Sequence, residues 1–369
     1  MNARVQVFGP AYLDRVLRVD QPLLDRDGGP PLDQSVEGRP RFGSGDRLEL
    51  VDPLGTTLSV AVPDDWPGPR GGFGLEQAMA SVFQGTRNLR AESWSDDLGG
   101  MGAGFAAALD GTLISALGGE NDPTSQAVET LLRRYGIVHR ALRVVDRPAD
   151  WTLLVSSGGH GDKLAVGFRG CHAALAAEAL NPALAEPCAV RVVAGLPNRL
   201  AKVALRAPGA GFRLFAPAMR NMIDREPPVS EFAGAVDILC CNRREWEALD
   251  DREEVAARVS LLIVTDGASG SESRYTDPQG DARTIRLPAF PRARPPRDTN
   301  RAGEAFAATL TATLIGLDWD SASGVIDDET MATAMGRASA AAALVLDRVE
   351  FGFPTDSEIE AAIRIGRVD

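Results

Sequence analysis

A turn near the end of the sequence combines accessible backbone amides with a carboxylate. Residues 297–304 have the sequence RDTNRAGE, and the apolar stretch that follows predicts a helix over 303–315. Small residues at the helix start leave the amides of Ala302, Gly303 and Glu304 accessible. Because a helix N-terminus carries about half a positive charge, these amides suit an anion such as a phosphoryl group.

Glu304 itself admits two interpretations. Beside a bound anion, its carboxylate could accept the proton of a hydroxyl group. Alternatively, Glu304 complements the helix dipole while Asp298 or Asn300 caps the helix. The residues by themselves favour this second, structural interpretation.

A second turn follows a short apolar strand predicted over 238–241. Asn242 and Glu245, in the sequence NRRE, could hold a hydrated Mg²⁺ ion, since hard cations prefer oxygen ligands. Asn242 as N-cap with Glu245 at the third helical position would equally form a capping box. Taken alone, this turn favours the capping interpretation.

Three further features are less specific. Thr265, Gly267 and Gly270, in TDGASG, could let a backbone approach a ligand closely, although they also suit a tight turn. GGMGAG at 99–104 superficially resembles a dinucleotide fingerprint, but the preceding SDD does not predict the required strand, so we exclude NAD binding there. Asp14, just beyond the first strand, could bind hydroxyl groups or cap a turn.

The elements that must position these turns alternate between strand and helix. Apolar strands are predicted over 5–8, 112–117, 190–194, 212–215, 238–241 and 261–264, and helices over 125–135, 244–257, 303–315 and 331–346. This alternation predicts an α/β fold with a doubly wound, mostly parallel sheet flanked by helices. Two predicted hairpins, within 47–62 and 151–169, would add a small β-layer at one edge.

Composition narrows the classes of partner. The 369 residues carry 51 acidic and 39 basic side chains, a formal charge of −12, so nucleic acid is not expected as a partner. No run approaches 18 apolar residues and the first residues lack an apolar signal region, so no membrane partner is expected. The four cysteines show no CxxC spacing, which is typical of a reducing compartment. We expect a cytoplasmic protein.

Rare residues exclude several enzyme classes. Neither of the two lysines, Lys163 and Lys202, lies in a Walker A loop or in the VAIK strand of protein kinases. The sequence contains no HExxH and no GxSxG, which removes support for zincin and α/β-hydrolase chemistry. Catalysis would therefore rest on carboxylates, backbone amides and arginines.

The order of these motifs resembles the PfkB (ribokinase-like) carbohydrate kinase family. The resemblance rests on an Asp after the first strand, an early GG helix, a hairpin, NRRE, TDGASG and, most specifically, DTNRAGEAF. It covers the first 20 residues and then about residue 99 to the end. The segment between them is longer than usual for the family and contains a second GG, at 71–72.

The resemblance implies a ribokinase-like fold with a core and a lid. The nucleotide- and substrate-binding α/β core would comprise 1–20, 66–150 and 170–369, and the β-sheet lid and insertion would comprise 21–65 and 151–169. By the same likeness a homodimer would form through the lid.

The resemblance also implies roles for individual residues. Glu304 matches the catalytic base, and Ala302 and Gly303 match the anion hole. The side chain of Arg301 has no counterpart in the family pattern, and our own hypothesis is that it adds a positive charge beside them. Asn242 and Glu245 match the Mg²⁺–phosphate motif. Thr265, Gly267 and Gly270 match the nucleotide-contact loop. The substrate-side positions are matched by Asp14, Gly99, Gly100 and Asp298.

Departures from the family pattern bear on activity. The family's GAGD is RAGE here, so Arg301 replaces a glycine and Glu304 replaces an aspartate. Glutamate keeps the carboxylate but is one methylene longer, and a displacement near 1 Å can cost about 10²-fold in rate. Gly104 and His172 stand where asparagine is frequent, and Arg337 where a small or amide residue is frequent, so the usual sugar specificity is not carried over.

Two functional hypotheses follow. The first is ATP-dependent, Mg²⁺-assisted phosphorylation of a hydroxyl on a sugar or related small polyol, with nucleosides included and a K⁺ requirement left open. The second, motivated by Arg301 and Glu304, is a pseudokinase that senses a sugar or nucleotide without turnover. A third and weaker alternative is an enzyme of the same fold acting on a vitamin-like alcohol.

Overall fold

The computed structural model describes two compact units. It covers residues 4–19, 47–51, 57–61, 91–157, 162–294, 296, 300–321, 323–348 and 350–368. The larger unit comprises Met1–Leu13, Leu98–Trp151 and Phe168–Asp369, and the smaller one comprises Asp14–Asp97 and Thr152–Gly167. Among the described residues, no helix has both the length and the apolar character needed to cross a bilayer.

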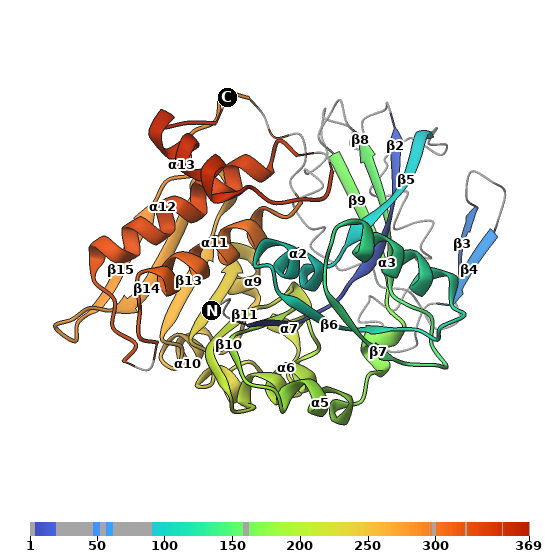
Figure 1. The fold of residues 1–369 in the computed structure, drawn as a ribbon, viewed down its shortest axis with the longest axis horizontal. Helices are drawn as coiled ribbons and strands as arrows, with labels where there is room; N and C mark the ends of the chain where they lie inside the picture. Colours follow the sequence, from blue (N-terminus) through green and yellow to red (C-terminus); the bar gives the residue numbers. More distant parts are fainter. Residues whose placement is uncertain are drawn as a thin grey trace. The chain divides into compact units, whose positions relative to one another are not determined.

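The larger unit is built on a nine-stranded sheet, which confirms the predicted doubly wound α/β fold (Figure 1). Seven neighbouring strands run parallel, namely β7, β6, β1, β10, β11, β12 and β13. β14 and β15 continue the sheet beyond β13 as an antiparallel hairpin. In spatial order the strands are β15 (Ala282–Leu287), β14 (Ser271–Thr276), β13 (Leu261–Thr265), β12 (Ile238–Asn242), β11 (Ala210–Ala216), β10 (Cys188–Ala194), β1 (Val5–Phe8), β6 (Thr112–Leu117) and β7 (His139–Arg143).

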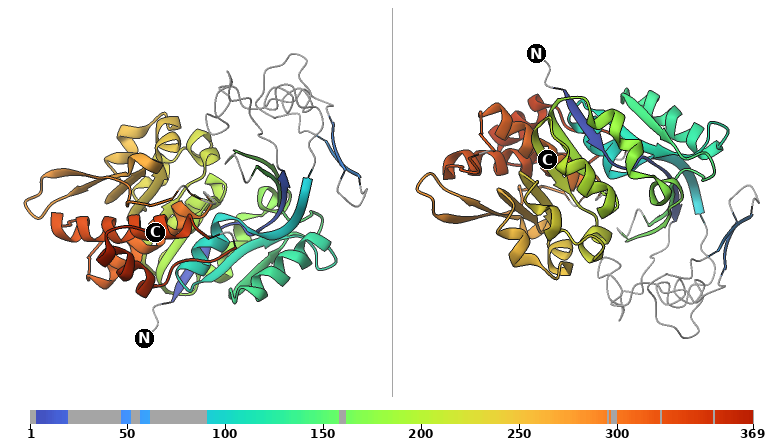
Figure 2. Two further views of the ribbon diagram at one scale, coloured as in Figure 1. Left: turned by 90° about the horizontal axis from the view of Figure 1, so that it is seen from above. Right: turned by 90° about the horizontal axis from the view of Figure 1, so that it is seen from below.

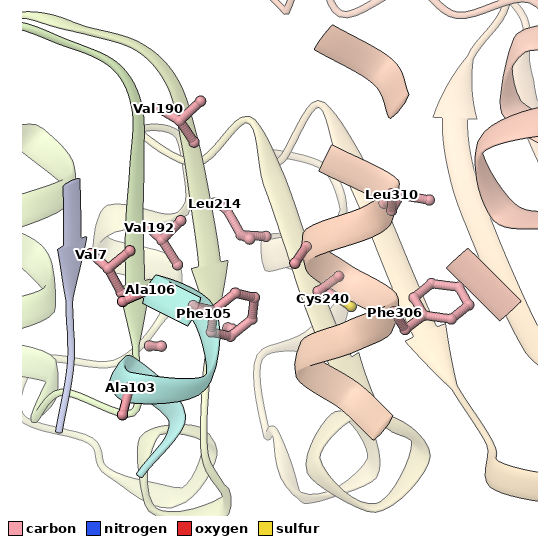
Figure 3. Packing of buried hydrophobic residues seen from close by; sticks show 14 of the residues in the cluster. Val7, Ala103, Phe105, Ala106, Val190, Val192, Leu214, Cys240, Phe306 and Leu310 are labelled. Carbon is pink, nitrogen blue, oxygen red and sulfur yellow. The ribbon is translucent and has the colours of Figure 1, made fainter. Parts of the chain in front are cut away.

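Strand residues alternate between two cores, one on each face of this sheet. Val192 packs against one helix layer, whereas the next residue, Val193, packs against the other. The first layer is formed by α2 (Met101–Ala108), α3 (Pro123–Arg134), α11 (Ala302–Gly316) and α12 (Asp328–Val345). Figure 3 shows Phe105 of α2 and Phe306 of α11 in this core, together with Leu214 and Cys240 of the sheet.

The second layer consists of shorter helices. They include α4 (Cys171–Ala174), α5 (Asn181–Leu184), α6 (Asn198–Arg206), α7 (Met219–Ile223), α8 (Ser230–Ala233), α9 (Arg243–Ala248) and α10 (Arg252–Ala256). At the C-terminus, α13 (Asp356–Ile365) packs against α12.

Some predicted elements differ from those observed. The single helix predicted over 244–257 is two helices, α9 and α10, because Leu249 adopts an extended backbone and is buried in the core. Within the nine-stranded sheet, the strands β7, β14 and β15 were not predicted. All six β15 residues are at least partly exposed at the sheet edge, where an apolar strand pattern does not develop. The β14–β15 hairpin extends from that edge (Figure 2).

A separate four-stranded sheet has the order β5 (Ala91–Gly99), β2 (Tyr12–Val19), β8 (Trp151–Ser157) and β9 (Asp162–Phe168). β3 (Arg47–Val51) and β4 (Thr57–Ala61) form an antiparallel pair of their own, so both predicted hairpins correspond to adjacent strands. The expectation that SDD lies outside a strand is wrong, since residues 95–97 belong to β5. β5 is in the four-stranded sheet, however, not in the parallel sheet that a dinucleotide-binding βαβ unit requires.

Candidate active site

Helix α11 begins with an open turn. Arg301 occupies the N-cap position with φ of 67°, and its side chain forms no capping hydrogen bond. The N-cap is therefore Arg301 and not Asn300, while Asp298 lies outside the described residues. Gly303 is exposed, and apart from its chain neighbours and the backbone of its own helix no atom lies within 4 Å of the place where a Cβ would stand. An anion can therefore approach this first turn, where the helix dipole favours negative charge.

Arg301 adds a cation to the same turn. Its guanidinium carbon lies 5.6 Å from the centre of the Phe351 ring, and Phe351 is buried. Its charge acts to lower the pKa of Glu304, which places the guanidinium within electrostatic reach of that carboxylate. The turn thus presents positive charge from both the helix and a side chain.

Glu304 is half-buried in the first turn of α11. Burial raises the pKa of Glu304, against the opposing effects of its own backbone amide and of Arg301. The side chain lies against α2, since a Cβ built at Gly104 would be 3.1 Å from the Glu304 Cγ. A carboxylate whose pKa is raised by burial is a stronger proton acceptor than one in water.

Asn242 and Glu245 form a complete capping box at the start of α9. The Glu245 amide donates to the Asn242 side-chain oxygen at 2.9 Å, and the Asn242 amide donates to Glu245 Oε2 at 2.9 Å. The structural interpretation of this pair is therefore confirmed. A second role in cation binding would have to use the oxygens that remain available in this arrangement.

The two carboxylates Glu245 and Glu304 interact electrostatically. Burial raises the pKa of Glu245 to about 7, and the negative charge of Glu304 adds to the increase. Burial raises the pKa of the nearby Cys240 thiol to about 12, and the charges of Glu245 and Glu304 add to the increase. Like charges held together in a desolvated site fit a divalent cation, which would favour the ionised form of each.

Thr265 lies beside Asn242 in the sheet. The two residues are register partners at the carboxyl ends of β12 and β13, and the Thr265 hydroxyl donates to the Cys241 carbonyl at 3.4 Å. The 3₁₀ turn Gly267–Ser269 that follows is exposed, and Gly267 has φ of 50° with no atom near its missing Cβ. This exposed turn leaves room for a ligand beside Gly267.

Gly270 has a structural reason to be glycine. Its φ is 97°, and a Cβ there would lie 2.0 Å from the Leu287 carbonyl oxygen. Gly100, the N-cap of α2, is similar, with φ of 95° and a Cβ position 2.4 Å from the Pro10 carbonyl oxygen. Close backbone packing therefore explains both glycines without a ligand.

The remaining substrate-side residues are divided between the two units. Gly99 is the buried last residue of β5 and belongs to the larger unit together with Gly100. Asp14 is the third residue of β2 and belongs to the smaller unit. Within the larger unit, the structure brings Glu304 near Glu245, and Asn242 beside Thr265.

Comparison with known proteins identifies the family. A model of the pfkB family of carbohydrate kinases matches residues 77–358, which is more than half of the chain. The chain belongs to the pfkB family. No curated protein sequence matches the chain.

Solved structures show the same fold. Ribokinase from Giardia lamblia is 17% identical with a TM-score of 0.64, and 99% of each chain is covered. The nucleoside kinase of Burkholderia thailandensis in complex with inosine is 15% identical with a TM-score of 0.64, covering 98% of this chain and 97% of that one. Ribokinase from Cryptococcus neoformans in complex with ADP is 16% identical with a TM-score of 0.59, covering 97% and 99%.

Sequence reasoning missed three neighbours of the site in this pfkB chain. Cys240 lies within electrostatic range of Glu304, and the Phe351 ring lies beside the Arg301 guanidinium. Phe353 lies beside the Cβ position of Gly104. Cys240 is the third residue of an apolar strand, and the two phenylalanines lie between α12 and α13 without helical or strand periodicity. No local pattern could have indicated their partners.

A buried cluster outside this site has the residue types of a metal centre. Asp150, Cys171 and His172 are the one such group found among the described residues. The Ala116 amide donates to His172 Nε2 at 3.3 Å, so the ring proton is on Nδ1, 3.2 Å from Asp150. Burial raises the pKa of the Cys171 thiol to about 12. The Ala116 amide and the Asp150 carboxylate thus occupy the two ring nitrogens of His172, so contacts within the protein account for this buried cluster.

Proposed function

We propose that this chain transfers the γ-phosphoryl group of ATP to a hydroxyl group of a sugar or related small polyol, nucleosides included. Its membership of a family of carbohydrate kinases supports this reaction class. The observation that carries the proposal is the α11 turn, where the half-buried Glu304 stands beside an open helix N-terminus. Phosphoryl transfer requires positioning and charge stabilisation, and this turn offers both.

Glu304 is the proposed general base. Its carboxylate takes the proton of the acceptor hydroxyl while that oxygen forms a bond to the γ-phosphorus, and the bond from phosphorus to the ADP oxygen breaks. The amides of Ala302 and Gly303, with the helix dipole, stabilise charge on the transferred group. Arg301 supplies a further positive charge from the N-cap position.

Asn242 and Glu245 are the proposed residues for Mg²⁺. The raised pKa of Glu245, about 7, and the nearby charge of Glu304 fit a cation held beside this turn. Bound Mg²⁺ would neutralise the phosphate oxygens, and Asn242 and Glu245 would hold it through water with the capping box closed. Thr265, Gly267 and Gly270 are the proposed nucleotide-contact residues, and the ADP complex of the related ribokinase supports nucleotide binding by this fold.

The remaining assignments rest on the likeness to the family. They comprise a substrate-side role for Asp14, Gly99, Gly100 and Asp298, a lid formed within the smaller unit, a homodimer through that lid and a K⁺ requirement. The proposed cytoplasmic location rests instead on the composition of the chain and the spacing of its cysteines. A comparison of rates in potassium and sodium buffers decides the K⁺ requirement directly.

A screen of sugars, polyols and nucleosides for ATP-dependent phosphorylation tests the function. We expect turnover with at least one acceptor and a loss of about 10²–10⁴-fold in kcat for Glu304→Gln, with ATP binding retained in calorimetry. Glu329→Gln is the matched control, because Glu329 is an exposed carboxylate in the first turn of another helix, α12.

The substitutions at Arg301 and Glu304 favour one alternative, a pseudokinase that senses a sugar or nucleotide. In that case ATP binds, no acceptor in the panel is phosphorylated, and Glu304→Gln changes neither result.

A further inference from the structure

Gly104 lies directly opposite the Glu304 side chain. A Cβ at position 104 would be 3.1 Å from Glu304 Cγ, 3.5 Å from Glu304 Cβ and 3.5 Å from Phe353 Cζ. Carbon atoms pack best at about 3.5–4.0 Å, so only the contact with Glu304 Cγ is too close. The Cγ methylene group of Glu304 therefore lies against the space that a side chain at position 104 would fill.

The backbone does not explain this glycine. Gly104 lies inside α2, where glycine is less favourable than alanine, and it is not among the glycines with positive φ. At Gly100 and Gly102, by contrast, an added Cβ would meet backbone atoms within 2.4 Å. At Gly104 the nearest atoms all belong to side chains, and two of the three belong to Glu304.

We propose that Gly104 is the positioning residue of Glu304. By leaving the Cβ position vacant, Gly104 lets the longer glutamate fold back against α2, so that its carboxylate is held beside the α11 turn. The catalytic part of this proposal rests on the function proposed above, whereas the packing part does not. Phe353 completes the wall on the α12–α13 side and is in ordinary contact distance.

Gly104→Ala tests the catalytic part. The new methyl group moves Glu304 Cγ by a few tenths of an ångström or changes its rotamer, and the carboxylate at the end of the side chain moves further. We expect kcat to fall by about 10–100-fold while KM for MgATP stays within about twofold.

Gly336→Ala is the matched control, because Gly336 lies inside α12 with no atom outside its own helix backbone and chain neighbours within 4 Å of its missing Cβ. The kcat of Gly336→Ala should equal that of the wild type. Unchanged kcat in Gly104→Ala would overturn the proposal.

Thermal unfolding tests the packing part without any activity assay. Gly336→Ala should raise Tm by about 1–2 °C, as alanine favours helix. Gly104→Ala should not raise Tm in the wild type or in Glu304→Gln, because glutamine keeps the shape of the side chain. In Glu304→Ala, where Cγ is absent, Gly104→Ala should raise Tm by the full gain of about 1–2 °C, the same as Gly336→Ala. The same Tm change in all three backgrounds contradicts the proposal. If the wild type phosphorylates no acceptor, the proposed function fails, and this Tm comparison still decides whether Gly104 positions Glu304.

Discussion

Glu245 and Glu304 are half-buried carboxylates, and the fold shifts the pKa of both in the same direction. Burial raises the pKa of both, and at Glu245 the charge of Glu304 adds to it. A carboxyl whose folded-state pKa exceeds its unfolded value binds more protons in the native state. Its contribution to stability is therefore lost as pH rises from the unfolded pKa through the folded one.

We predict that Glu245→Gln weakens the pH dependence of stability between pH 5 and pH 8. In the wild type, the free energy of unfolding falls as pH rises from the ordinary pKa of Glu245, 4.5, to about 7, and glutamine removes this ionisation while retaining an oxygen for the Asn242 amide. Urea denaturation at several pH values measures the slope. Glu329→Gln, at an exposed residue, should leave the wild-type slope, and an equal slope in Glu245→Gln would contradict the assignment.

Asn242 permits the capping and cation roles to be separated at the residue scale. Asn242→Ala should lower the free energy of unfolding by about 1 kcal/mol, because the Glu245 amide loses its acceptor. Asn242→Ser keeps a capping oxygen, so stability should stay within about 0.5 kcal/mol of the wild type. If Asn242 also serves Mg²⁺, the serine variant needs more Mg²⁺ for half-maximal rate. An unchanged Mg²⁺ dependence would assign Asn242 to capping alone.

At the scale of elements, the turn between β13 and β14 contains two glycines of different kinds. Gly270→Ala should lower the free energy of unfolding by about 2–5 kcal/mol, since it combines positive φ with a clash against the Leu287 carbonyl. Gly267→Ala should cost only about 1–2 kcal/mol, because φ is positive but the space is open. Chemical denaturation measures both. Similar losses of stability in the two variants would mean that the Leu287 carbonyl of β15 does not restrict the side chain at position 270.

Helices α2 and α11 show how elements far apart in the sequence assemble one site. Both pack on the same face of the parallel sheet, and Phe105 and Phe306 share its core (Figure 3). That packing brings Gly104 against Glu304, although 199 residues separate them along the chain. The site chemistry thus depends on a helix–helix contact as well as on the turn that begins α11.

At the scale of the whole molecule, we predict a homodimer through the four-stranded sheet, a prediction carried over from the family resemblance. Light scattering should give a mass of twice the 39.1 kDa chain. Trp94, on the edge strand β5, is 38% exposed and is the natural position for a disrupting charge. Trp94→Glu should shift the protein toward monomer, with Val145→Glu, an 80% exposed position in the larger unit, as control. A monomeric wild type would refute the prediction.

Local pattern was sufficient for much of the fold. Short, mostly apolar runs such as Val5–Phe8 and Thr112–Leu117 have the predicted bounds, because a strand buried on both faces is composed mainly of apolar residues. The exposed strand β15 lacked that signal, and the buried Leu249 split a helix that periodicity alone could not divide. The family, too, was recognisable from the order of its turns, as the match over 77–358 confirms.

The sequence by itself determined the residue types of the site, since glycine, amide and carboxylate stand at the ends of predictable strands and at the start of a predictable helix. Only the tertiary structure decided which of them meet. The contact of Gly104 with Glu304 and the mutual repulsion of Glu245 and Glu304 arise where helices pack on a sheet, between residues distant along the chain. Burial and long-range contact are properties of that packing, and no local spacing encodes them.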